Sequence, residues 1–166
     1  MLATLTTNSV GYNVVARHDL TLSEYVRRRN GVPLGSSGAL REMLKRSLGA
    51  KSFTVFWQFW NPIFGYYLGR YVYRPSRSLG LPSVIAIIIT FCVSGAIHDL
   101  AATAVSQQLI FVCTPAFFFM AVGLLFSRTL GMDLSGLPWI MRAAAHLLYL
   151  GTCVTLALLL RDISVI

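Results

Sequence analysis

Two side chains that could take part in proton transfer or polar recognition lie in strongly apolar stretches of this sequence. His98 lies in the segment FCVSGAIHDL, and Asn61 lies in the segment FWQFWNP. An ionisable side chain within an apolar span is energetically costly, and by default it indicates a functional site. Because charged groups are disfavoured in apolar surroundings, we expect a buried, neutral His98 imidazole that can accept a proton. The alternative is a histidine that hydrogen-bonds between helices and serves packing alone.

The neighbours of His98 extend this candidate site. Ser94 lies one helical turn earlier on the same face, so its hydroxyl can contact the same ligand. Gly95 and Ala96 would allow a second helix to approach closely. Asp99 points about 100° away from His98 in a helix. We therefore do not expect the Asp99 carboxylate to pair with the imidazole.

The other histidines and the cysteines do not indicate a metal site. The dipeptides His18–Asp19 and His98–Asp99 both read HD, but an HD-type metal phosphohydrolase needs more His and Asp ligands than this chain has. His146 lies one turn after Arg142, and snorkelling toward the membrane interface explains it better than chemistry. Three cysteines stand alone in apolar stretches: Cys92, Cys113 and Cys153. Their dispersal excludes a zinc site, and their odd number argues against a disulfide framework.

The composition indicates a protein whose solvent is lipid. Of the 166 residues, 55% are hydrophobic and only 12% are charged, and the net charge is +8. Eight of the 14 basic residues lie between Arg17 and Lys51, whereas the second half is almost uncharged. Basic flanks of membrane helices explain this distribution. Nucleic-acid binding is excluded as a main function, because such a protein would not usually leave half its length apolar.

Three apolar stretches are long enough to cross a bilayer, which takes about 20 residues. They are residues 83–104, 109–127 and 143–160. The VSQQ loop between the first two stretches is uncharged, and arginines flank the ends of the stretches that face away from this loop. The positive-inside rule therefore predicts that this loop lies outside and that residues 128–142 lie in the cytoplasm. Pro115 is expected to kink the second span.

Residues 53–73 form an aromatic run that fits a simple span less well. Ten of these 21 residues are aromatic. Lys51 and Arg70 flank the run, so crossing the membrane would place one basic cluster on the wrong side. Pro62 would also break a helix near its midpoint. We therefore predict a broken, interfacial or re-entrant helix, and irregular backbone at that depth is tolerated where it builds a site or is buried in protein.

The first 52 residues are predicted to form a basic amphipathic segment at the cytoplasmic side or the membrane interface. Thr21 and Glu24 fit a capping box at the start of a short helix. SSGALREMLKRSL places apolar residues on one face, which is typical of a helix on a membrane surface or of a solvated helix packed on its own domain. The first 15 residues lack the basic leader and apolar core of a cleavable signal peptide. The whole prediction is an all-α polytopic membrane protein with amphipathic N-terminal helices and a membrane core over 53–166.

Two motifs together resemble the membrane-bound O-acyltransferase family. They are FWQFWNP, followed by a tyrosine-rich segment that ends in arginine, and SGAIH further along in a membrane helix. In that family an aromatic, tryptophan-containing motif carries an Asn, Asp or His, and a downstream helix carries the catalytic histidine. Asn61 matches the first position and His98 the second. The resemblance covers about residues 50–150, the C-terminal core of a family whose members usually have eight or more spans.

The resemblance implies transfer of an acyl group from acyl-coenzyme A, as co-substrate, to a hydroxyl of a lipid-like acceptor. His98 would be the general base, and Asn61 would orient a reactant or stabilise an oxyanion. No other cofactor and no metal are implied. The aromatic pair Trp57 and Trp60 would hold Asn61 and line the substrate site with Ser94. Coenzyme A phosphates would meet basic residues that topology alone also explains: Arg70, Arg74 and Arg77.

Other interpretations stay open at this point. A chain with so few spans would complete its tunnel as a homo-oligomer or with partner membrane subunits, surrounded by membrane lipids. It could instead be a non-catalytic subunit of a larger membrane complex that keeps the fold without the chemistry. A small transporter subunit with breaks at Pro62 and Pro115 is a third possibility, although no repeated hydropathy pattern supports it. The absence of a targeting peptide fits a bacterial inner membrane.

Overall fold

All regular secondary structure in the described residues, 20–164, is helical in the computed structural model. The elements are α1 (Leu22–Asn30), α2 (Ala39–Leu48), α3 (Phe53–Phe59), α4 (Pro62–Leu68), the π-helix η2 (Gly69–Tyr73), α5 (Arg74–Ser78), α6 (Ser83–Ser106), α7 (Cys113–Thr129) and α8 (Trp139–Ser164). The all-α prediction is therefore confirmed for this part of the chain. The expectation about a signal peptide and the dipeptide His18–Asp19 lie outside the described residues.

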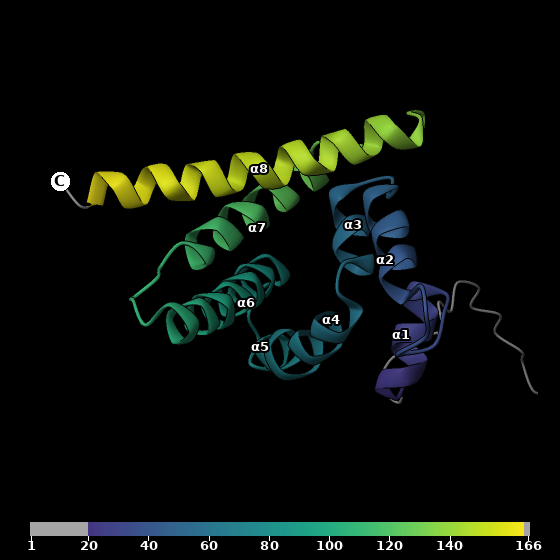
Figure 1. The fold of residues 1–166 in the computed structure, drawn as a ribbon, viewed down its shortest axis with the longest axis horizontal. Coiled ribbons are helices and arrows are strands. Elements are labelled where there is room, and N and C mark those ends of the chain that lie inside the picture. The colour runs from purple at the N-terminus through teal and green to yellow at the C-terminus, as the bar shows by residue number, and fades with distance from the viewer. Residues whose placement is uncertain (1–19, 165–166) are drawn as a thin grey trace, which may run out of the picture.

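The three long helices pack side by side, and the short helices lie at one end and along the side away from α8 (Figure 1). Figure 1 shows α8 along one edge, with α7 next to it and α6 beyond α7. The helices α1, α2 and α3 lie at one end, and α4 and α5 lie on the side away from α8. A buried cluster joins α7 to α8: Ala116, Met120, Cys153 and Ala157. Three of these side chains, Ala116, Cys153 and Ala157, are small and allow the two helices to approach closely, as is common between membrane helices.

Two of the described helices are long and apolar enough to cross a membrane. They are α6 and α8, and they contain the predicted spans 83–104 and 143–160. The third predicted span, 109–127, begins later than expected, at Cys113, and α7 has only 17 residues. Pro115 therefore lies in the first turn of α7. A proline is tolerated there because the N–H it lacks would have no partner within the helix.

The aromatic run is broken, as Pro62 predicts. Helix α3 ends at Phe59, and Trp60 adopts an extended backbone with φ −69° and ψ 124°. Helix α4 then begins at Pro62. The run therefore changes direction within two residues, and α3 and α4 lie at different angles (Figure 1).

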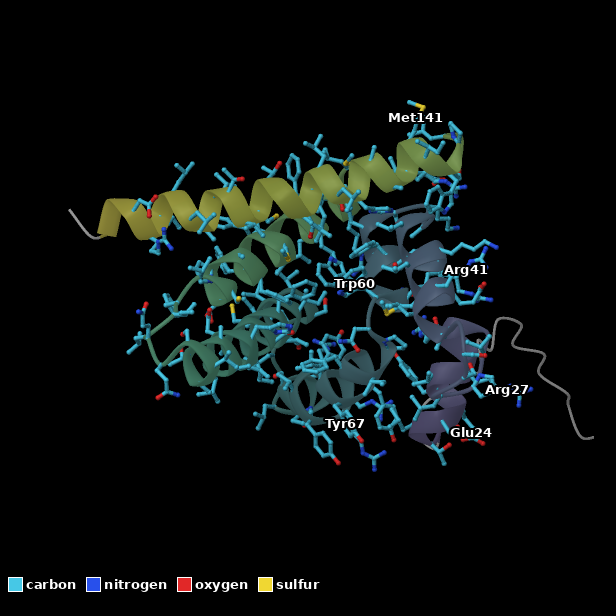
Figure 2. All side chains as sticks on the ribbon, in the orientation of Figure 1. Glu24, Arg27, Arg41, Trp60, Tyr67 and Met141 are labelled. Atoms are coloured by element: carbon cyan, nitrogen blue, oxygen red, sulfur yellow. The ribbon has the colours of Figure 1, made fainter. Side chains whose placement is uncertain are left out.

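The N-terminal helices form as predicted at α1 and α2. The side chain of Thr21 accepts from the Glu24 N–H, and the Glu24 carboxylate accepts from the Thr21 N–H, which completes the capping box. The Thr21 N–H and the Thr21 hydroxyl both donate to the Glu24 carboxylate, and these two hydrogen bonds hold the pKa of Glu24 below its usual value. Figure 2 shows the side chains of Glu24, Arg27 and Arg41 on the outer side of these helices.

His146 fastens the N-terminal part to α8, and the snorkelling interpretation of this residue is wrong. Its side chain is fully buried. Its Nε2 lies 3.0 Å from the Ala50 carbonyl oxygen, and its ring stacks on Phe56 with centroids 4.9 Å apart. Trp139 adds a second link, because its Nε1 donates to the Lys45 carbonyl at 3.1 Å. The His146 side chain is buried because α2 and α3 cover this part of α8.

Candidate active site

Asn61 stands at the break between α3 and α4, where it caps the second helix. Its backbone is left-handed, with φ 41° and ψ 70°, a conformation that asparagine tolerates better than most residues. Its Oδ1 accepts a hydrogen bond of 3.3 Å from the Phe64 N–H. Pro62 follows at the first helical position, where its missing N–H is not needed. The cap uses the carbonyl oxygen of the amide only, so Nδ2 can still donate to a ligand.

His98 lies on α6 with its hydrogen-bonding geometry fixed by its own helix. Its Nδ1 lies 2.7 Å from the Ser94 carbonyl oxygen. A carbonyl only accepts, so Nδ1 must carry the proton, and in the neutral ring Nε2 is then the free acceptor. Phe64 and Phe117 flank the ring, with centroids 5.7 Å and 5.1 Å away. The imidazole is therefore oriented as a general base would need to be.

Both candidate residues line one apolar cavity, which we call the His98 pocket. Its volume is about 250 Å³, and side chains of α3, α4, η2, α6 and α7 form its walls. Polar or hydroxyl-bearing side chains on its lining are few: Asn61, Tyr73, Thr90, Ser94 and His98. A mainly apolar cavity with a few polar groups is typical of a small-molecule site.

The exposure of His98 differs from expectation. The sequence predicts a buried residue, but His98 is exposed while it also lines the pocket. The imidazole therefore lies at the open side of the cavity, because α3, α4, α6 and α7 do not enclose it completely. Ser94, one turn earlier, is buried, with 6% of its surface exposed.

Trp57 and Trp60 form the wall next to Asn61, and both line the His98 pocket. Phe56 is fully buried between them, stacked on Trp60 at 5.3 Å and edge-on to Trp57 at 5.1 Å. Trp57 also meets Phe91 of α6 edge-on at 5.0 Å. Figure 2 shows Trp60 at the centre of the molecule, where α3 ends, and Tyr67 on the outer face of α4. These ring contacts fix the position at which the break presents Asn61.

A second cavity, which we call the arginine pocket, adjoins the first and has a volume of about 500 Å³. Five arginines from four elements line it: Arg28, Arg29, Arg70, Arg74 and Arg128. Its described lining contains no aspartate or glutamate. Arg29 donates to Gln58 at 2.9 Å, and Arg70 donates to the Tyr66 hydroxyl at 3.3 Å. Five guanidinium groups around one cavity give it a positive potential, which favours an anionic ligand.

The structure brings together most of the predicted site residues. Asn61, Ser94, His98 and the two tryptophans share the His98 pocket, and two of the three predicted arginines lie in the arginine pocket. Arg77 lines neither pocket, and its Nη1 donates to the Leu81 carbonyl at 2.5 Å at the end of α5.

Sequence reasoning missed three of the pocket arginines. Arg28 and Arg29 follow Tyr25 by three and four residues on α1, so a helical face with an aromatic and two cations was visible in the sequence. Arg128 lies at the end of α7, and only the packing of α7 against α3 and α6 brings it to this site.

Asp99 has a role that the sequence did not indicate. It does not pair with His98; its buried carboxylate binds the start of α7 instead. Oδ1 accepts from the N–H groups of Val112 and Cys113 at 3.0 Å and 2.7 Å. Oδ2 accepts from the N–H and the hydroxyl of Thr114 at 2.7 Å and 2.6 Å. Helix α7 has no cap of its own, so a neighbouring helix supplies one.

Helix α7 in turn carries Phe117 onto the His98 ring. Gly95 supports the same joint, because a Cβ there would lie 2.6 Å from the Thr114 Cα. The α6–α7 joint thus sets one wall of the His98 pocket.

The described residues thus form a helical fold with two helices apolar enough to cross a membrane and a polar pair in an apolar pocket. A comparison with protein-family profiles matches residues 23–160 to MBOAT, the membrane-bound O-acyltransferase family. The chain therefore belongs to this family, and the family predicted from the sequence is confirmed. Searches of the curated proteins and of the solved structures each found no match.

Proposed function

We propose that this protein transfers an acyl group from acyl-coenzyme A to a hydroxyl of a lipid-like acceptor. Membership of the membrane-bound O-acyltransferase family supports acyl transfer as the class of reaction. The observation that carries the proposal is the free Nε2 of His98, which shares an apolar pocket with the Asn61 amide. The adjoining arginine pocket supports a donor with phosphate groups.

In the proposed reaction, His98 Nε2 takes the proton of the acceptor hydroxyl as its oxygen attacks the thioester carbonyl carbon. The negative charge that develops on the carbonyl oxygen is stabilised by a hydrogen bond from Asn61 Nδ2. The intermediate then collapses and the carbon–sulfur bond breaks. The leaving thiolate receives the proton from the imidazolium, which yields an ester and free coenzyme A. Positioned general-base catalysis of this kind contributes about 10²–10⁴ in rate.

The donor is proposed to place its phosphates in the arginine pocket and its acyl chain against the apolar wall of the His98 pocket. Arginine is suited to phosphate because its planar guanidinium can donate two parallel hydrogen bonds. Of the three arginines first assigned to phosphate, Arg70 and Arg74 keep this role and Arg28, Arg29 and Arg128 join them. Arg77 lies outside both pockets, so we assign it no phosphate contact.

The membrane arrangement in this proposal follows the sequence analysis. We propose that α7 crosses the bilayer with α6 and α8, that the 105–108 loop lies outside, and that α3 and α4 form an interfacial or re-entrant pair with basic residues on the cytoplasmic side. Residues 1–52 would lie at that cytoplasmic face. The membrane is proposed to be a bacterial inner membrane, with lipids and either further copies or partner subunits around the chain.

The test is acyl transfer by the purified protein in lipid nanodiscs. Long-chain acyl-coenzyme A is supplied with a fatty alcohol, a diacylglycerol or a sterol, and both free thiol and ester product are measured. We expect His98→Gln, which keeps a similar size without a base, to lower turnover by at least about 10²-fold. Its melting temperature and its binding of coenzyme A should match the wild type. Turnover in His98→Gln equal to that of the wild type would exclude the proposed base.

A second candidate function is that of a non-catalytic subunit of a larger membrane complex. The exposure of His98 at an incompletely enclosed pocket favours it, as do the large apolar side chains exposed on α6, α7 and α8. This alternative predicts no thioester cleavage with any acceptor. It also predicts that His98→Gln changes the size of the complex in native detergent extracts.

A further inference from the structure

The two pockets share part of their lining. Six residues belong to both: Trp57, Gly65, Gly69, Tyr73, Ile87 and Phe91. Gly65 and Gly69 lie one turn apart on the α4–η2 side, and Ile87 and Phe91 lie one turn apart on α6. The boundary between a cationic cavity and an apolar cavity therefore has two glycines on one side.

The fold does not require a glycine at position 69. Its backbone is that of an ordinary right-handed helix, with φ −61° and ψ −41°. A Cβ added there would meet nothing within 4 Å. A Cβ at Gly65 would meet only the Tyr25 hydroxyl, at 3.7 Å, which is ordinary contact. Glycine within a helix is less favourable than alanine by about 0.8–1.0 kcal/mol.

Two other helical glycines of this chain, Gly95 and Gly123, have a structural reason. A Cβ at Gly95 would lie 2.6 Å from the Thr114 Cα, and a Cβ at Gly123 would lie 2.7 Å from a Tyr149 ring carbon. At those positions a neighbouring helix occupies the space. At Gly69 the corresponding space is empty and belongs to both pockets.

We propose that Gly65 and Gly69 determine substrate specificity by keeping open a narrow passage between the arginine pocket and the His98 pocket. The passage admits an unbranched arm, so one ligand can place its anionic part among the arginines and its apolar chain beside His98. This inference rests on the proposed function, because it takes acyl-coenzyme A as the ligand that spans both pockets. It adds that a bulky side chain at position 69 would block access of the acyl chain to His98 but would leave recognition of the phosphates unchanged.

The test compares two probes, coenzyme A and palmitoyl-coenzyme A, on the protein in nanodiscs by calorimetry. The wild type should bind the palmitoyl probe more tightly, because only its chain reaches the His98 pocket. In Gly69→Leu the ratio of the two affinities should fall by at least tenfold, which corresponds to about 1.4 kcal/mol. Its affinity for coenzyme A alone should stay within twofold of the wild type, and Gly69→Ala should show a smaller loss.

Gly151→Leu is the matched control. Gly151 also lies within a helix with nothing within 4 Å of an added Cβ, but it lines neither pocket. Its variant should retain the full preference for the palmitoyl probe. The melting temperature of Gly69→Ala should equal or exceed that of the wild type, because alanine favours the helix.

Several results would overturn the inference. They are an unchanged preference in Gly69→Leu, a loss of coenzyme A binding in that variant, no preference in the wild type, or a less stable Gly69→Ala protein. Failure of the proposed function would look different. If the wild type and the variants bind as expected but no ester forms, the passage stands and acyl transfer does not.

Discussion

Replacing Asp99 with alanine should destabilise the protein by about 3 kcal/mol or more. The buried carboxylate accepts three backbone N–H groups and one hydroxyl, at 2.6–3.0 Å, from the start of α7. Each buried donor left without a partner costs about 1–3 kcal/mol. Three N–H groups give about 3 kcal/mol at the lower limit, which applies where water can reach some of them. Thr114→Val removes only the hydroxyl and should cost about 1 kcal/mol.

The assay is reversible unfolding in mixed micelles with increasing denaturing detergent, followed by tryptophan fluorescence. Asp99→Asn should fall between the other two variants, because its amide can still accept from Val112 and Cys113 but not from the Thr114 N–H. Asp162→Ala, at an exposed carboxylate, serves as the control and should change stability by less than about 0.5 kcal/mol. If Asp99→Ala unfolds within 1 kcal/mol of the wild type, the argument that α6 caps α7 is refuted.

Three further substitutions test the remaining structural arguments. Asn61→Gly should retain the left-handed backbone and cost only a few tenths of a kcal/mol of stability. A large loss of acyl transfer in a stable Asn61→Gly protein would therefore assign the amide to the chemistry. Equal losses of activity and stability would argue against that role. Gly95→Ala should cost at least about 1–3 kcal/mol, because its Cβ would press on the Thr114 backbone, and a melting temperature equal to the wild type would contradict that packing. His146→Leu should weaken the attachment of α8 by about 1–3 kcal/mol, because the contact with the Ala50 carbonyl is lost. Amide hydrogen exchange of residues 45–55 should then become faster. Unchanged exchange would place the attachment elsewhere.

The sequence predicted the elements whose signals are local. The capping box at Thr21 and Glu24 and the break at Pro62 each depend on a few neighbouring residues, and both formed as expected. The long apolar stretches also predicted α6 and α8, because about 20 apolar residues in succession have few other uses. The two-motif pattern grouped Asn61 with His98, and both residues line one pocket in the structure.

Features that depend on packing between helices could not be predicted in the same way. Asp99 and His146 both looked peripheral, because their partners lie 13 to 15 residues away in one case and 96 in the other. The start of α7 was misplaced because residues 109–112 are apolar yet lie outside the helix, where Asp99 caps it. Exposure of His98 likewise depends on how far four helices close around it, which no local pattern specifies.

The π-helix η2 has a consequence for the register of the chain. A π turn accommodates one residue more than an α turn, and each residue of an α-helix advances the face by about 100°. If the same residues formed an ordinary α turn, with no residue removed, everything after this turn up to Ser78 would be rotated by about that angle. Arg70 would keep its place and Arg74 would swing away from the cavity. The π turn therefore sets the rotation of the residues that follow it about the helix axis, and thus which arginines face the cavity.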